Sequence, residues 1–359
     1  MPLAPDLAAW LRLSLTTGLG GEAFRKLLLS FGGPEQILGA SRTALTAVVS
    51  GKLADAILEG NFYSEPAAVE SWINDSHNHI VTLADTEYPQ ALLQTPDPPP
   101  LIYVKGRREL LNQPSLAVVG SRNATAQGKL TAESFATALS NAGLCIVSGM
   151  ALGIDAAAHR GGLAGLSSTI AIVGTGLDKV YPARNRDLAH AIADKGVIVS
   201  EFALGTPPLA ANFPRRNRLI SGMTRGCLVV EAALSSGSLI TARIANELGK
   251  DVFAIPGSIH STLSKGCHVL IKQGAKLVDD ASDILTELRL PLPAGGNPQP
   301  DSDAFRHPLL AHMAFDPCDI DTLAGRAGLP VHEISATLIQ LELEGAVASL
   351  AGGLWQRGA

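Results

Sequence analysis

Six short runs rich in β-branched residues lie between residues 115 and 257, separated by glycine-containing turns and helical patterns. Runs that are apolar throughout are typical of strands covered on both faces, and helical crossovers between such strands make them parallel. The sequence therefore predicts an α/β protein with an extended Rossmann-like, doubly wound parallel sheet. The expected strands read SLAVVG, LCIVSG, STIAIVG, GVIVSE, CLVVEA and DVFAIPG.

Weaker patterns flank this sheet. The N-terminal part alternates short helical patterns with glycine turns, as in a SAM-like or helix-hairpin-helix module, and its Gly18–Gly21 turn could bind a phosphate or simply join helices. Residues 80–114 are proline-rich and are interpreted as an extended connector. The expected boundaries are 1–78 for the helical domain, 79–288 for the sheet domain, 289–304 for a linker and 305–359 for a winged-helix domain.

The C-terminal part shows three helical patterns followed by a hairpin with a Gly-Gly turn, which predicts the winged helix. The helix that would enter a DNA groove carries Glu333, Glu342 and Glu344 and no Lys or Arg. Because such a helix must neutralise phosphates, duplex recognition by this domain is disfavoured, and a protein-contact or structural role is favoured.

Ligands of doubly wound sheets bind beyond the carboxyl ends of the strands, where small residues let them approach. Glycine, serine and arginine recur at these ends. With the arginine-rich segment after residue 211, they form the predicted polyanion-binding set: Gly120, Ser121, Arg122, Gly149, Gly153, Gly174, Gly176, Lys179, Arg215, Arg216, Asn217, Arg218, Ser236, Gly237 and Ser238.

The turn after the first of these strands argues against a dinucleotide. A dinucleotide fingerprint would need glycine where Arg122 and Thr125 stand. An arginine at this turn instead offers a fork of donors to a phosphate. The alternative is that Arg122 caps carbonyl groups or pairs with Glu201 or Glu231.

Two neighbouring strand ends carry less certain candidates. Asp155, in a first helical turn, is either a helix cap or a ligand-binding group, and His159 is interpreted as a packing residue. Further on, Lys179 could follow a nucleic-acid backbone and Tyr181 could stack on a base. The alternative is a solvated loop with Tyr181 buried.

The segment NFPRRNRLISGMTR contains four arginines and no acid. If Pro214 begins a helix, Arg215, Arg216 and Arg218 lie at its positive end, where the helix dipole disfavours them and a bound phosphate would remove the conflict. The alternative is pairing with Glu201, Glu231 or Asp187. Arg225 is as well suited to a structural partner or solvent as to DNA.

Composition restricts the remaining choices. The net charge of −5 gives no global attraction to nucleic acid or membranes, so a polyanion site must be local. The four cysteines lack zinc-site spacing, and no catalytic constellation, metal set or cofactor motif is found. No signal peptide or long apolar segment is present, which predicts a cytoplasmic protein without membrane contact.

Several motifs in order resemble one family. From YPQALLQTPDPPPLIYVKG through VVGSRNATAQGK, VSGMALGIDAAAH, IAIVGTGLDKVYPARN and FPRRNRLISGMTRGCLVVEAALSSGSLITARIANELGK, the chain resembles the DprA (also called Smf) family, bacterial DNA-processing proteins of natural transformation. The resemblance covers about residues 85–285. One departure is Leu152, where the family usually has arginine, which puts part of the site in doubt.

The resemblance implies a non-enzymatic role: binding and protecting incoming single-stranded DNA, and loading the RecA recombinase onto it past single-strand binding protein. It also implies a homodimer formed near GCHVLIKQGA, and a DNA pocket that includes Arg122. Because aromatic residues are 4% of the chain, binding is expected to be driven by phosphates and to tolerate any sequence.

Two other classes stay open. An enzyme resembling the lysine-decarboxylase-like phosphoribohydrolases would need a Pro-Gly-Gly signature that is missing before GTGLD and after Glu231. A pure adaptor would use the sheet only as a scaffold for protein contacts.

Overall fold

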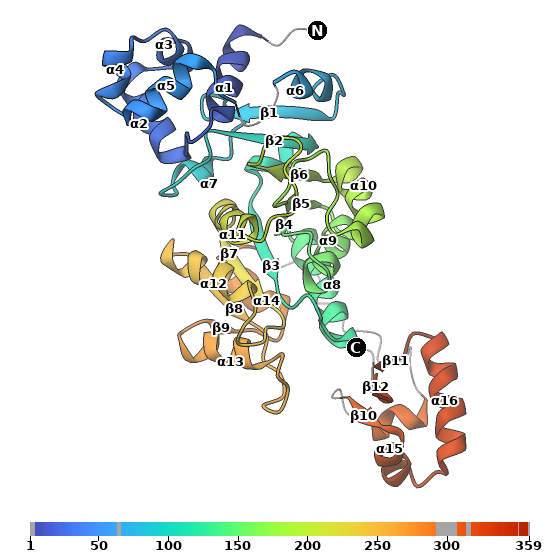
Figure 1. The fold of residues 1–359 in the computed structure, drawn as a ribbon. Coiled ribbons are helices and arrows are strands. Elements are labelled where there is room, and N and C mark those ends of the chain that lie inside the picture. The colour runs from blue at the N-terminus through green and yellow to red at the C-terminus, as the bar shows by residue number, and fades with distance from the viewer. Residues whose placement is uncertain (1–3, 63–65, 292–306, 314–316, 351, 358–359) are drawn as a thin grey trace.

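The protein is built around one large sheet (Figure 1). The computed structural model describes residues 4–62, 66–291, 307–313, 317–350 and 352–357. Its central sheet has the order β1-β2-β6-β5-β4-β3-β7-β8-β9. The strands are β1 Asn78–Thr82, β2 Leu101–Gly106, β3 Ser115–Val119, β4 Cys145–Ser148, β5 Thr169–Ile172, β6 Val197–Ser200, β7 Gly226–Val229, β8 Asp251–Ala254 and β9 Lys276–Leu277.

The six predicted strands are confirmed as β3 to β8, and every neighbouring pair among them is parallel. Strands β3 to β7 are buried at every position because helices cover both faces, which explains their lack of polar alternation. The strand order reverses between β3 and β7: β4, β5 and β6 follow on one side, and β8 and β9 on the other. This reversal places a crevice at the carboxyl ends of β3 and β7.

The interpretation of residues 80–114 as a connector is wrong in part. Strand β2 pairs antiparallel with β6, with Tyr103 opposite Ser200, and β1 pairs antiparallel with β2. The sheet is therefore mixed at this edge. The prolines at 96 and 98–100 precede the strand and do not enter it, and residues 101–104 are buried like the central strands.

Helices cover both faces of the sheet. One face packs on α11 Asn212–Met223, α12 Ser238–Glu247 and α13 Lys265–Lys272. The other packs on α8 Ala126–Asn141, α9 Ile154–Ala164 and α14 Ala281–Glu287. The remaining elements beside the sheet are α7 Gln90–Leu93, α10 Arg186–Lys195, and the 3₁₀ helices η1 Arg108–Asn112 and η2 Ala183–Asn185.

The N-terminal module is helical, and it shares a core with the sheet domain. Tyr103 of β2 and Leu204, which follows β6, are buried in the same apolar cluster as Trp10 and Phe24. The module is therefore packed against the end of the sheet formed by β1 and β2 (Figure 1). Its helices are α1 Pro5–Leu15, α2 Gly21–Phe31, α3 Pro34–Leu38, α4 Arg42–Thr46, α5 Gly51–Glu59 and α6 Pro66–Trp72.

The C-terminal part forms a separate small core. In the first predicted helix, FRHPLLAHM, the described residues from His307 onwards form only a 3₁₀ turn, because the chain extends again at Met313. Residues 292–304 of the predicted linker 289–304 lie outside the described residues. Glu333 and Glu342 on α16 and Glu344 directly after it are all exposed, and Glu342 accepts hydrogen bonds from Ser349. The elements are η3 Pro308–His312, β10 Cys318–Asp319, α15 Ile320–Ala327, α16 Val331–Leu343, β11 Val347–Leu350 and β12 Leu354–Arg357.

Candidate nucleic-acid interface

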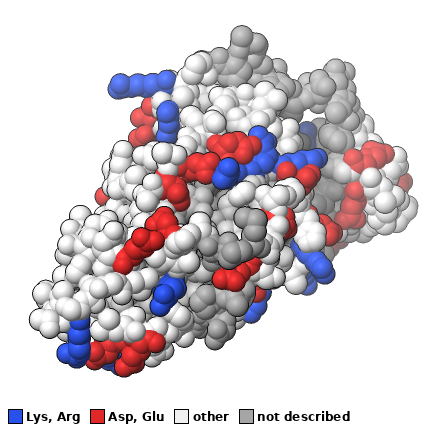
Figure 2. Space-filling model, turned by 90° about the horizontal axis from the view of Figure 1, so that it is seen from above, with Lys and Arg blue, Asp and Glu red and all other residues white. Residues whose placement is uncertain are grey.

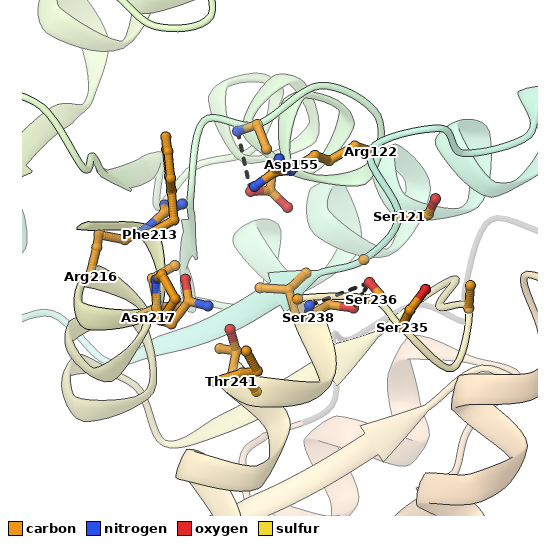
Figure 3. A pocket seen from close by; sticks show the side chains of 18 of the residues that line it. Ser121, Arg122, Asp155, Phe213, Arg216, Asn217, Ser235, Ser236, Ser238 and Thr241 are labelled. Carbon is orange, nitrogen blue, oxygen red and sulfur yellow. Dashed lines mark hydrogen bonds between the residues drawn. The ribbon is translucent and has the colours of Figure 1, made fainter. Parts of the chain in front are cut away.

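A cavity of about 690 Å³ lies in the crevice where the strand order reverses. Its walls come from the turn after β3, the loop between β4 and α9, the start of α11, and the turn between β7 and α12. Figure 3 shows Arg122 and Asp155 on one wall, Phe213, Arg216 and Asn217 on a second, and Ser235, Ser236 and Ser238 with Thr241 on a third.

Arg122 is the exposed cation of this cavity. Its guanidinium lies over the ring of Phe213, 5.6 Å from the ring centroid. Neither predicted partner pairs with it. Glu231 accepts hydrogen bonds from the backbone N–H and the hydroxyl of Thr125, and Glu201 pairs with Arg215 and Arg218. Within the described ranges, Arg122 has no ion pair, so its charge is available to an anion.

Arg216 reaches the same cavity from α11, but it is 4% exposed. Its Nη1 donates to the carbonyl oxygen of Ile172, while Nε has no hydrogen-bond partner in the described structure. Burial lowers its pKa to about 10, so it remains a cation at neutral pH. Arg216 therefore gives the back of the cavity a positive charge that is shielded from water.

Asp155 moderates this charge. Its carboxylate accepts hydrogen bonds from the backbone N–H groups of Gly149 and Ala151, both 3.2 Å away, which precede α9. Asp155 therefore does not cap α9 as predicted. It accepts hydrogen bonds from backbone N–H groups as a cap would, but these groups belong to the loop before the helix. Burial raises the pKa of Asp155, and the charge of Arg216 opposes this effect.

Arg215 and Arg218 lie on the opposite face of α11. Both donate to Glu201, whose side chain is 2% exposed, and Arg218 also contacts Asp97. The pairing alternative is therefore confirmed for Glu201, and it is wrong for Glu231 and Asp187 among the described contacts. The helix also begins at Asn212 rather than at Pro214, so Pro214 is its third residue, where a missing N–H still costs nothing.

The turn formed by residues 235–238, called the serine turn below, lies in the third wall of the cavity. Ser236 Oγ and Ser238 Oγ are 2.7 Å apart, and Gly237 between them precedes the first turn of α12. A Cβ atom at Gly237 would meet no heavy atom within 4 Å. Asn217, one turn from Phe213, lines the cavity opposite. These groups offer hydroxyl, amide and backbone donors to a ligand.

Most of the predicted glycines make room for protein atoms. A Cβ at Gly149 would lie 2.0 Å from Arg216 Nη1, and one at Gly153, where φ is +76°, would lie 2.2 Å from the Ser121 carbonyl oxygen. Close contacts of the same kind surround Gly120 and Gly176, and Gly174 lies against Phe213. Gly149, Gly153 and Gly174 thus lie against residues of the cavity wall and Gly120 is itself part of that wall, whereas Gly176 lies against Ala203 and Leu204 outside it.

Three further residues fall outside the cavity. Lys179 donates to the carbonyl oxygen of Gly205 and lines a neighbouring hollow. His159 is fully buried, which confirms its packing role. Leu152, at the position where the family usually has arginine, is half-buried and does not line the cavity.

Phe213 was missed at the sequence level. Its ring lies in the cavity wall, 5.7 Å from the ring of Tyr181 between centroids. Apart from its place directly before Pro-Arg-Arg, nothing in the sequence distinguishes it from a core phenylalanine. The wall thus combines aromatic faces with a cation, and both can bind an unpaired nucleotide.

One face of the molecule, seen in Figure 2, shows no broad positive patch. On the face shown in Figure 2, basic and acidic side chains are interspersed on a mostly uncharged surface. The four cysteines are buried free thiols, and no metal-binding group of side chains occurs in the described ranges. None of the described helices is long and apolar enough to cross a membrane.

Fold and cavity together define a class: a doubly wound protein with a local cationic and aromatic site at its switch point, flanked by a helical module and a winged helix. The family model for DNA recombination-mediator protein A matches residues 79–289, and that for the DprA winged helix domain matches residues 293–353. The chain therefore belongs to the DprA/Smf family of DNA-processing proteins.

Known relatives match over most of the chain. Protein Smf of Escherichia coli (strain K12) is 39% identical over 97% of this chain and 95% of its own length. The X-ray structure of DprA from Streptococcus pneumoniae matches with a TM-score of 0.70 at 38% identity, over 80% of this chain and 99% of that one. The structure of DprA from Helicobacter pylori, solved for insight into its single-stranded DNA binding mode, matches with a TM-score of 0.54 at 31% identity, over 60% and 97%.

Proposed function

We propose that this protein binds single-stranded DNA in the cavity between β3, α11 and α12. The observation that carries the proposal is the Arg122 guanidinium, which has no ion pair among the described residues and lies over Phe213 at the switch point of the sheet. A phosphate of the strand would contact Arg122 and the Ser236–Ser238 turn, and a base would stack on Phe213. The single-stranded DNA binding mode of the Helicobacter pylori relative supports this choice of ligand.

Members of the predicted DNA-binding set have different parts in this proposal. Arg122, Asn217, Ser236, Gly237 and Ser238 contact the strand. Gly149, Gly153 and Arg216 hold the cavity open and positive behind it. Arg215 and Arg218 mainly form ion pairs with Glu201, and the exposed part of the Arg215 side chain weakly attracts the DNA.

A salt series with a fluorescent oligonucleotide tests the proposal. The logarithm of affinity should fall with the logarithm of salt concentration, at a slope of about −0.7 for each phosphate contact. Arg122→Ala should weaken binding and flatten this slope by about one contact. Arg160→Ala removes an exposed arginine of α9 that pairs with Glu133 of α8, and it should change neither the affinity nor the slope.

Phe213→Leu provides a second test, because it removes a stacking surface and no charge. Binding should weaken by about 1–3 kcal/mol with an unchanged salt slope. If Arg122→Ala and Phe213→Leu both leave affinity and slope as in the wild type, the cavity is not the DNA site.

The family supplies two further parts of the proposal. The bound strand is protected and passed to RecA in the presence of single-strand binding protein, and the chain acts as a homodimer through the surface near residues 266–275. Light scattering would measure the dimer. RecA filament formation on protein-coated DNA would test the loading, and a rate unaffected by this protein would contradict it.

A nucleotide-processing enzyme is the second candidate. Its glutamate would be Glu231, but that carboxylate is bonded to Thr125 and does not line the cavity. Release of free base from nucleoside monophosphates would favour the enzyme over the binding protein.

A further inference from the structure

A second, smaller hollow of about 170 Å³ lies beside the cavity, between β5, β6 and α10. Its lining is mostly apolar: Met150, Val173, Ala189 and Ile198 are each less than 9% exposed and belong to one apolar cluster. The space equals that of about six water molecules at liquid density, which suits one small ring system better than a protein element.

Two features connect the hollow to the cavity. Tyr181 lines both, and its side chain is 45% exposed, so it stands at the boundary between them. The loop after β4 also contributes to both, because Ala151 lines the cavity and Met150 lines the hollow. A strand that leaves the cavity past Tyr181 would therefore meet the hollow next.

Met150 is held in place against its backbone preference. Its φ of 62° lies in the left-handed region, which is costly for a residue with a side chain. Two buried contacts fix it: its N–H donates to His159 Nε2, and its carbonyl oxygen accepts from Asn185 Nδ2 at 2.8 Å. The side chain that this conformation positions is a polarizable thioether, which packs well against aromatic rings.

Basic side chains stand around this apolar space. Lys105, Lys179 and His190 are lining residues, and no acid is among them. Asp75 contacts Lys105 from outside, at 3.6 Å, and Lys179 donates to the Gly205 carbonyl oxygen. An apolar ring attached to an anion fits this combination, because the ring enters the hollow while the anion stays near the lysines.

We propose that the hollow binds one nucleobase of the same DNA strand whose phosphate contacts Arg122. This inference rests on the proposed function and deepens it, because it assigns Lys179 and Tyr181 to a second base subsite. The base lies against Met150 and Val173, Tyr181 separates it from the base on Phe213, and Lys179 faces the connecting phosphate.

Filling the hollow tests the subsite. Ala193 lines it and Ala191 does not, although both lie on α10 and both are half-buried. Ala193→Leu should weaken oligonucleotide binding about tenfold, the lower part of the range for losing one stacked base. Ala191→Leu should bind as the wild type does.

Oligonucleotides with a single abasic position sharpen this test. For wild type and Ala191→Leu, two abasic positions should each weaken binding, one for the base on Phe213 and one for the base in the hollow. For Ala193→Leu, the second penalty should vanish. Equal losses for the two leucine variants, or an abasic penalty that Ala193→Leu retains, would overturn the subsite; unchanged binding of Ala193→Leu would point to a protein side chain as occupant instead.

A measurement on the wild-type chain is independent of folding defects. Oligonucleotides carrying 4-thiothymidine at successive positions should crosslink to Met150 or Tyr181 from one position, identified by mass spectrometry of the peptides. Crosslinks that map only to Phe213 and the Ser236–Ser238 turn would contradict the subsite while leaving the proposed function intact. A wild-type protein that binds no oligonucleotide would contradict both.

Discussion

Two arginine-bearing segments meet at the carboxyl edge of the sheet, and they use their charges differently. The turn after β3 presents Arg122 to an open cavity with only an aromatic ring beneath it. Helix α11 carries three arginines, of which Arg216 is buried and Arg215 and Arg218 contact Glu201. Helix α11, the segment with more arginines, therefore offers less positive charge to a ligand.

This difference shows that the number of arginines in a segment does not measure its capacity to bind an anion. A guanidinium that is hydrogen-bonded inside the fold stabilises the walls, and a guanidinium in an open cavity can contact a ligand. The division predicts that substitution of the buried Arg216 changes stability, whereas substitution of Arg122 changes binding.

The largest expected effect is on Arg216. Arg216→Met should lower the free energy of unfolding by about 3 kcal/mol, because the buried carboxylate of Asp155 loses the positive charge that offsets its burial and the Ile172 carbonyl loses the Arg216 donor. Arg122→Met should change the same quantity by less than about 0.5 kcal/mol. Urea denaturation measures both, and equal losses would remove the distinction between the two segments.

The next effect concerns the space that Arg216 occupies. Gly149→Ala places a Cβ atom 2.0 Å from Arg216 Nη1 and should cost about 2 kcal/mol of stability. Gly237→Ala is the matched control, because its Cβ would meet no heavy atom and its backbone is already helical. If the two variants are equally stable, Arg216 is free to move and is not fixed by the loop.

The smallest effect is a pH dependence on the buried side of the cavity. Burial lowers the pKa of His159, and the positive charges of Arg216 and Arg160 lower it further, to about 3. In the fold, its Nε2 accepts from the Met150 N–H and its Nδ1 bonds to the Thr169 hydroxyl. The unfolded chain takes up a proton near pH 6.5 while the folded chain does not, so stability falls as the pH falls from about 6.5 towards 3.

His159→Gln isolates this contribution, because the other ionisable groups are unchanged. Between pH 7.5 and 5.5, the free energy of unfolding of the wild type should drop by about 1.4 kcal/mol more than that of the variant. Parallel pH profiles would show that His159 is not held neutral in the fold.

Much of the sheet could be predicted from the sequence, and parts of the site could not. Strands β3 to β8 are continuous apolar runs, and their ends point to Arg122 and the serine turn. Strand β2 was hidden because it follows a run of prolines. Phe213 was hidden because an aromatic residue in a cavity wall and one in a core have the same local pattern.

The sequence by itself determined the doubly wound sheet, its family, and the gathering of glycine, serine and arginine at one edge, because these follow from local periodicity and from motifs in order. Only the tertiary structure decided which arginines are available. That depends on whether a carboxylate or carbonyl from a distant segment, such as Glu201 or Ile172, reaches the guanidinium first, and a contact between distant segments leaves no local pattern in the chain.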